Sequence, residues 1–146
     1  MSKLEKIMEV RDIAFHKIKE ASGLQETACS CSACQSMCRN VPCLGTPEDI
    51  AAIMEAGFGH NLSKTIWGVD ARNGTGPLID MIQPMLTSRG CIFLNPDGKC
   101  DLHERGLKPT EGRLAHHAQA PTPLAKLVAE EWKNFRTFME NHEAHG

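Results

Sequence analysis

The sequence predicts a small α+β domain that is mainly α-helical and is stapled by a bound metal. Two observations lead to this prediction. Apolar residues recur at helical spacing near both ends of the chain, whereas seven cysteines are concentrated in one loop and one short β-hairpin. The chain has 146 residues, the size of one ordinary domain, and no linker divides it. We therefore expect a single domain over residues 1–146, with three main helices.

Two long amphipathic helices are predicted towards the ends of the chain. Residues 3–22 place apolar side chains at steps of three and four, and Ser22-Gly23 is a plausible stop. Residues 123–142 repeat this pattern, and their apolar face carries Leu124, Leu127, Val128, Trp132, Phe135, Phe138 and Met139. Both faces are expected to pack on the domain itself, although the C-terminal face also suits an adaptor that binds a protein partner.

A shorter helix is predicted in "TPEDIAAIMEAGFG", residues 46–59. Thr46 is a good N-cap, and Pro47 suits the first helical position because its missing N–H would have no helical partner there. Either Gly57 or Gly59 is expected to end the helix, since glycine readily adopts the left-handed conformation that follows a last helical turn.

The clearest β signal is "CIFLNPDGKCDLH", residues 91–103. Two short runs flank Asp97-Gly98, which is strong turn chemistry, so a hairpin is expected. Its two arms would bring Cys91 and Cys100 to one place.

The remaining segments are less specific. Within residues 60–90, "LIDMIQPML" and the stretch around Ile66 each suit a strand or a short helix, and the choice stays open. Residues 107–123 contain several prolines and read as a connector.

The composition argues against several classes of protein. The net charge is −2 with both signs interspersed, which gives no broad basic surface for nucleic acid. No apolar run approaches the roughly 18 residues that cross a bilayer, and the N-terminal stretch is not a secretory signal. We therefore expect a cytoplasmic protein that binds neither nucleic acid nor membrane. In that reducing compartment, clustered thiols more often bind metal or catalyse than form lasting disulfides.

Five cysteines lie within the segment "CSCSACQSMCRNVPC", residues 29–43. Thiolate sulfur is a soft ligand that selects zinc or an iron–sulfur cluster over magnesium or calcium. Two cysteine pairs from separate segments are typical of structural zinc, whereas three close cysteines and a remote fourth suit a cluster. The crowding of thiols favours an iron–sulfur cluster marginally over zinc. The expected ligands are Cys31, Cys34, Cys38, Cys43, Cys91 and Cys100, and further candidates are Cys29, His103 and His116.

The sequence assigns no catalytic residues. It has no Ser-His-Asp layout, no phosphate-binding loop and no dinucleotide fingerprint. His103, Glu104 and Glu111 are the acid–base candidates near the cysteines. Enzymatic activity is therefore left uncertain, and the alternative to a plain metal-binding protein is a redox or metal-dependent enzyme that uses the same centre.

The order of these motifs resembles a known family. A compact cysteine loop, a capped helix, a "C-x-F-L…G-x-C-x-[LIV]" hairpin and a "K/R-P-x-x-x-R" segment follow one another over roughly residues 29–115. This order is similar to the zinc- or iron-chelating cysteine-cluster family, the YkgJ-like or CxxCxxCC proteins. The resemblance implies that pooled cysteines chelate a metal, and it implies no defined biochemical role.

The chain departs from the family pattern at two positions. Arg39 follows Cys38 where the family has a second adjacent cysteine, and Gly112 in "KPTEGR" stands where the family has a late cysteine. The resemblance therefore implies that Cys43, Cys29 or a nearby histidine replaces a ligand, or that the site is smaller.

Overall fold

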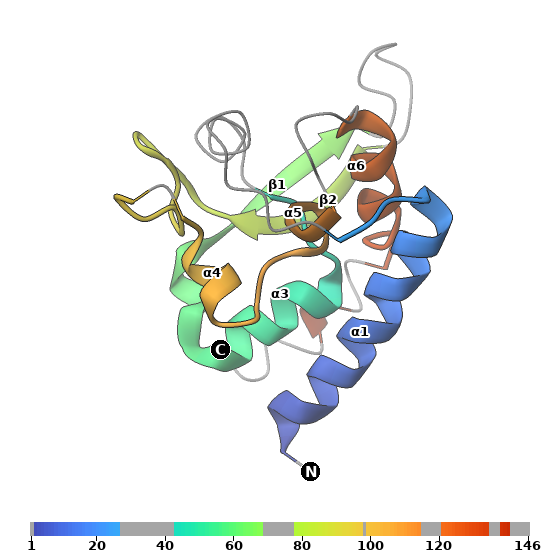
Figure 1. Ribbon diagram of the computed structural model, residues 1–146, viewed down its shortest axis with the longest axis horizontal. Helices are drawn as coiled ribbons and strands as arrows, with labels where there is room; N and C mark the ends of the chain where they lie inside the picture. Colours follow the sequence, from blue (N-terminus) through green and yellow to red (C-terminus); the bar gives the residue numbers. More distant parts are fainter. Residues whose placement is uncertain are drawn as a thin grey trace.

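Helices pack against the main two-stranded antiparallel sheet in the computed structural model (Figure 1). The structure describes residues 2–26, 43–68, 78–97, 99–114, 121–134 and 138–140. Over these residues the protein is α+β, as the sequence predicts. In chain order its elements are α1 (Lys3–Ser22), α3 (Pro47–Ile53), η1 (Met54–Phe58), η2 (Gly59–Asn61), β1 (Leu62–Gly68), β2 (Leu78–Pro84), β3 (Leu86–Thr87), β4 (Gly90–Cys91), α4 (Asp101–Glu104), α5 (Thr110–Leu114) and α6 (Pro121–Glu130).

Helix α1 has the bounds that its apolar spacing predicts, because local signals fix both of its ends. Ser2 is the N-cap, and its hydroxyl accepts a hydrogen bond from the Glu5 N–H at 3.1 Å. Gly23 ends the helix in the left-handed conformation, with φ of 71°, and its N–H donates to the Lys19 carbonyl. The inner face of α1 packs against α3 and α6.

Helix α3 begins with a capping box. The Thr46 hydroxyl accepts from the Asp49 N–H at 3.1 Å, and the Asp49 carboxylate accepts from the Thr46 N–H at 2.9 Å. The helix continues through the π-helical turn η1, where Gly57 has a φ of 98°. Gly57 rather than Gly59 therefore breaks the helical path.

Strands β1 and β2 form the main sheet. They pair antiparallel, with Leu62 opposite Pro84 at one end and Gly68 opposite Leu78 at the other. Ile79, Met81 and Ile82 of β2 are buried, and β2 contacts both α3 and α6 (Figure 1). The sequence leaves open whether the two apolar segments within residues 60–90 are strands or short helices, and the pairing shows that both are strands. Each strand is stabilised by its partner rather than by its own composition.

The prediction that the second arm of the hairpin is a strand is wrong. Asp101–Glu104, in "CDLH" and the following residue, forms α4, whereas β4 pairs with the short strand β3 that precedes it. Acidic Asp101 and Glu104 lie in the first turn of α4, where they complement the partial positive charge of the helix N-terminus. The two predicted arms meet through one isolated bridge, between Leu94 and Cys100.

The predicted turn between those arms is present. The Asn95 side-chain carbonyl accepts hydrogen bonds from the N–H groups of Asp97 and Lys99, each at 3.0 Å. The Asn95 N–H donates to the Lys99 carbonyl at 2.8 Å. The turn therefore brings the chain back beside itself although the regular hairpin is missing.

The C-terminal helix is shorter than predicted. Helix α6 ends at Glu130, and residues 131–134 form turns, so the predicted helix over 123–142 does not run unbroken through the described residues. The connector predicted over 107–123 contains α5, a helix that the sequence analysis missed. Together with α4, these changes give the described chain more helices than the three predicted. The predicted inner face is nevertheless buried at Leu124, Val128, Trp132 and Phe138.

A buried ion pair joins the helices. Arg11 of α1 and Asp49 of α3 are 3 % and 0 % exposed, and the Arg11 Nε lies 2.7 Å from the Asp49 Oδ1. The guanidinium also donates to the carbonyl oxygens of Gly106 at 2.9 Å and Lys108 at 2.6 Å. Burying two charges is costly unless they are paired and hydrogen-bonded, and this pair meets both conditions.

The Asp49 carboxylate has further donors. Its Oδ2 accepts from the Thr110 N–H at 2.8 Å and from the Thr110 hydroxyl at 2.6 Å, in addition to the Thr46 N–H. One carboxylate therefore ties together α1, the start of α3 and the start of α5.

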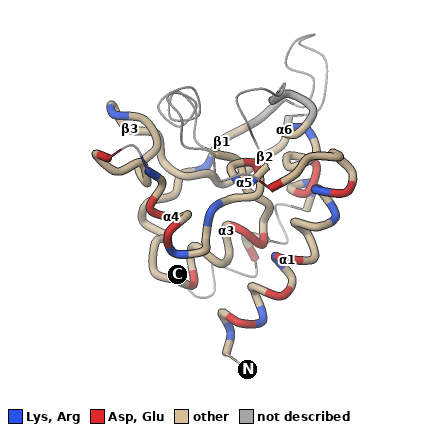
Figure 2. Tube along the Cα trace, in the orientation of Figure 1, with Lys and Arg blue, Asp and Glu red and all other residues tan. Residues whose placement is uncertain are grey.

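Charged residues of both signs are interspersed along α1. Figure 2 shows Lys and Arg interspersed with Asp and Glu along this helix. None of the described helices is both long enough and apolar enough to cross a membrane.

We expect Arg11→Leu to destabilise the protein by about 3 kcal/mol or more, because the substitution leaves the Asp49 carboxylate buried without its cation. Urea denaturation at neutral pH measures this loss. Lys17→Ala is the matched control, since Lys17 forms an exposed pair with Glu131 and its side chain is 68 % exposed. That control should cost less than about 1 kcal/mol, and equal losses in the two variants would contradict the assignment.

The Glu48 carboxyl at the start of α3 should give the stability a specific pH dependence. Burial, and then the negative charges of Glu131 and Asp49, raise the pKa of Glu48, and no described residue donates a hydrogen bond to its Oε2. The folded protein therefore holds this proton more tightly than the unfolded chain, so the contribution of Glu48 to stability is lost as the pH rises through the folded pKa.

The side chain at position 48 of the Glu48→Gln variant has no carboxyl group and cannot ionise. We expect the difference in unfolding free energy between this variant and the wild type to move in favour of the variant between about pH 4 and about pH 7. Denaturant titrations at several pH values measure the trend. A difference that is independent of pH would show that Glu48 keeps its ordinary pKa in the folded state.

Candidate functional site

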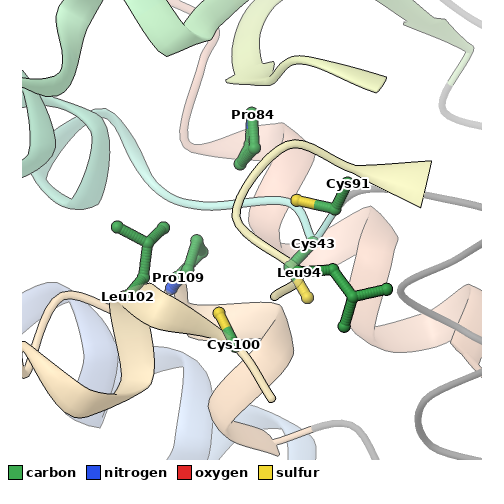
Figure 3. Close-up of a pocket in the computed structure, with 7 residues that line it drawn as sticks. All are labelled: Cys43, Pro84, Cys91, Leu94, Cys100, Leu102 and Pro109. Carbon is green, nitrogen blue, oxygen red and sulfur yellow. The ribbon is translucent and has the colours of Figure 1, made fainter. Parts of the chain in front are cut away.

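Three cysteines from separate segments line one small pocket. Cys43 precedes α3, Cys91 ends β4, and Cys100 precedes α4 (Figure 3). The pocket has a volume of about 10 Å³, roughly the space of one water-sized sphere. Its other lining residues are Pro84, Leu94, Leu102 and Pro109. Among the described residues that line it, sulfur is therefore the one kind of side-chain atom that can bind a metal.

Backbone hydrogen bonds position Cys91 and Cys100. The Cys91 carbonyl accepts from the Leu94 N–H at 2.9 Å, and Leu94 forms the isolated bridge with Cys100. The Asp101 N–H, next to Cys100, donates to the Phe93 carbonyl at 2.9 Å. The sequence prediction that the turn brings these two cysteines to one place is confirmed, although a single bridge and a tight loop accomplish it.

Hydrogen bonds also fix the backbone of Leu44 and Gly45, directly after Cys43. The Leu44 N–H donates to Glu111 Oε1 at 3.0 Å, and the Glu111 N–H donates to the Leu44 carbonyl at 3.0 Å. The indole N–H of Trp132 donates to the Gly45 carbonyl at 2.7 Å. Hydrogen bonds from α5 and from the residues after α6 therefore set the position of Cys43.

Two glycines leave room for this arrangement. A Cβ at Gly45 would lie 2.9 Å from the Asp49 Cβ and 3.1 Å from the Pro109 Cβ, so the backbone could not approach as it does. A Cβ at Gly112 would lie 2.9 Å from the Cys43 sulfur and 3.0 Å from the Lys108 Cε. Position 112 therefore borders directly on the Cys43 thiol.

The environment of the described cysteines is mostly apolar. Cys91 is 8 % exposed, and Cys43 and Cys100 are half-buried. All three are thiols rather than halves of a disulfide. An apolar pocket lined by sulfur suits a soft metal ion better than a hard one, because magnesium and calcium require oxygen ligands.

The structure places the other predicted ligands as follows. His103 lies on α4 with an exposed side chain, and it does not line the pocket. Cys29, Cys31, Cys34, Cys38 and His116 lie outside the described residues. Within the described ranges, no three side chains of His, Cys, Asp or Glu form a group that could hold a metal ion. The described thiols therefore supply at most a part of the predicted site.

Sequence analysis missed the groups that support these cysteines. Arg11 lies within the apolar stripe of residues 3–22, at a helical position that should be buried, and this was an available signal. Asp49 stands three residues after Thr46, which is the spacing of a capping box. Glu111 was considered as an acid–base candidate, whereas its carboxylate holds the Leu44 N–H.

No protein-family model matches this chain, and no match was found among curated proteins or solved structures.

Gly112→Ala should displace the Cys43 thiol. Because the added methyl group would lie within 3 Å of the sulfur, we expect a loss of stability of about 1–3 kcal/mol. Gly59→Ala is the matched control, since its Cβ would meet nothing closer than the Met54 Cγ at 3.9 Å and its φ is −57°. The control should leave stability unchanged or raise it by up to about 1 kcal/mol. Thermal or urea denaturation compares the two, and equal effects would contradict the contact at Gly112.

Proposed function

We propose that this chain is a cytoplasmic metal-binding protein. In this proposal Cys43, Cys91 and Cys100 join the cysteines of residues 29–38 to chelate an iron–sulfur cluster or a zinc ion. The observation that carries the proposal is the convergence of three cysteines, from three separate segments, on one sulfur-lined pocket.

Gly112 marks a departure from the pattern of the YkgJ-like cysteine-cluster family. The family pattern has a cysteine at this position, and a side chain here would lie against the Cys43 sulfur. A residue next to the Cys43 thiol is where a further ligand would be expected. Gly112 supplies no side chain, so the four cysteines of residues 29–38 become the remaining thiol donors of the proposed site.

The metal would act as a staple between segments. It would connect the cysteine-rich segment to β4 and to the start of α4, both of which are far from that segment in sequence. The iron–sulfur cluster keeps a marginal preference over zinc, because five thiols in one short segment exceed what one tetrahedral ion needs from it.

The adaptor alternative has lost its motivating observation. Its basis was the apolar stripe near the C-terminus, and Leu124, Val128 and Trp132 of this stripe are between 0 % and 2 % exposed. These side chains pack into the core of the domain. They are therefore not available to a partner in this conformation.

Anaerobic purification followed by metal analysis and a visible spectrum tests the proposal. We expect bound iron with sulfide and a coloured protein if the centre is a cluster, or stoichiometric zinc and a colourless protein if it is a zinc site. Cys91→Ser and Cys100→Ser should each lower the bound metal, because each removes a thiolate ligand.

His103→Ala is the control for these variants. It should retain the full metal content, since His103 is exposed and does not line the pocket. Wild-type protein that is fully folded and contains no metal would overturn the proposal.

A further inference from the structure

Two of the cysteines at the pocket lie on either side of one tight turn. Cys91 ends β4 and Cys100 is the N-cap of α4, and both residues contribute thiol groups to the lining of the pocket. We propose that Cys91 and Cys100 are a redox-sensitive pair, in which a peroxide oxidises the two thiols to one disulfide. This inference goes beyond the proposed function and needs no bound metal.

Backbone contacts place both cysteines beside Leu94. The Leu94 N–H donates to the Cys91 carbonyl at 2.9 Å, and a turn closed in this way keeps its first and last Cα atoms within about 7 Å. Leu94 also pairs with Cys100 in an antiparallel bridge, where opposite Cα atoms lie about 4.5–5.5 Å apart. The two cysteines therefore start from neighbouring positions, as a disulfide with its Cα separation of about 4.4–6.8 Å requires.

The side chains of the two cysteines meet at the same space. Figure 3 shows the sulfur atoms of Cys91 and Cys100 directed into the pocket from their two segments. The pocket holds a free volume of about 10 Å³. This volume gives the two sulfur atoms room to approach each other.

Cys43 is the third thiol of the pocket, and it is held against a different element. A Cβ at Gly112 would lie 2.9 Å from the Cys43 sulfur, so this sulfur packs against α5. Hydrogen bonds from Glu111 and Trp132 fix the backbone directly after Cys43. Cys43 therefore has less freedom to move towards another thiol than Cys100, which adjoins an exposed turn.

The turn between Cys91 and Cys100 is the part that can adjust. Pro96, Asp97 and Lys99 are exposed, and exposed turns with few buried contacts open at a low cost in free energy. Phe93 and Leu102, on the core side of the turn, are 5 % and 1 % exposed. A shift of the turn can therefore bring the two sulfur atoms to bonding distance while the core keeps its packing.

Burial sets the order of the two chemical steps. Cys100 is half-buried whereas Cys91 is 8 % exposed, so hydrogen peroxide meets Cys100 first. The Cys100 sulfur attacks one peroxide oxygen and the O–O bond breaks. Cys100 becomes a sulfenic acid, and the released hydroxide leaves as water with the thiol proton.

The second step forms the disulfide. The Cys91 sulfur attacks the Cys100 sulfur and displaces the sulfenic hydroxide, which leaves as a second water with the Cys91 proton. Two thiols thus lose two electrons and two protons, and one peroxide molecule becomes two water molecules. Cytoplasmic disulfides are usually transient and serve catalysis or redox sensing, so a reversible pair of this kind suits the compartment that we propose.

Tryptic peptide mapping of the full-length protein tests the inference. Cleavage after Lys99 separates the two cysteines, so residues 90–99 carry Cys91 and residues 100–105 carry Cys100. The protein is reduced, treated with a chelator and exposed to hydrogen peroxide; remaining thiols are then alkylated, and the digest is analysed by mass spectrometry without reduction. We expect Cys91 to be recovered chiefly in a linked pair of these two peptides, which dithiothreitol should separate.

Two controls show whether the fold selects this pair. In protein unfolded by urea before oxidation, Cys91 should be linked to several different cysteines. In folded Cys91→Ser the linked pair should be lost, and Cys100 should react more with dimedone than in the wild type, because its sulfenic acid has no second thiol to attack it.

Three outcomes would overturn the inference. The first is recovery of Cys91 mainly as the alkylated thiol. The second is linkage of Cys91 to residues 40–64, which carry Cys43, or to residues 20–39, which carry the four other cysteines. The third is the same mixture of links in the folded and the unfolded protein.

Discussion

The Arg11–Asp49 ion pair is the interaction on which the rest of the described structure depends. A buried carboxylate is tolerated when its charge is paired and its oxygens accept hydrogen bonds, and Asp49 meets this condition through groups from three different elements. The donors cannot move independently, because each one that departs leaves charge unsolvated in the core. The pair therefore fixes α1, α3 and α5 relative to one another more strictly than apolar packing would.

The position of Cys43 follows from that constraint through a short series of contacts. Asp49 holds Thr110, which begins α5; the next residue, Glu111, holds Leu44, and Leu44 follows Cys43. Trp132 adds a hydrogen bond from the residues after α6. Cys91 and Cys100 are placed separately by the Asn95 turn and by the bridge at Leu94. The three thiols are thus brought to one pocket by ordinary hydrogen bonds and packing.

Local signals explain what the sequence could predict. The bounds of α1 are set by Ser2 and Gly23, the start of α3 by Thr46, and the break in the helical path within η1 by Gly57, so these features are readable within a few residues. The convergence of Cys91 and Cys100 was predictable for the same reason, because the turn chemistry lies between them. The α+β class and the thiol-lined half of the candidate site were therefore within reach of the sequence.

Long-range contacts explain what the sequence could not predict. Helix α5 is too short to persist alone, and its position depends on Asp49, which lies far away in the chain. The early end of α6 at Glu130 places the Trp132 indole against Gly45, a contact that no local pattern encodes. Arg11 lies in the apolar stripe of α1, which indicates burial, but a charged residue within a helix is ordinarily solvated, and its burial becomes favourable only when Asp49 is present.

The described surroundings of the three cysteines differ from those in small zinc domains. Small zinc domains obtain most of their folding energy from the metal and are unfolded without it. Here the described helices are joined by a buried ion pair and an apolar core, and the proposed ligand Cys91 lies within that core. The arrangement of α1, α3 and α5 is therefore stabilised by protein contacts that involve no metal. Loss of the ion pair should accordingly disturb the position of Cys43 as well as the helices, because Asp49 holds Thr110 at the start of α5 and Glu111 of α5 holds Leu44.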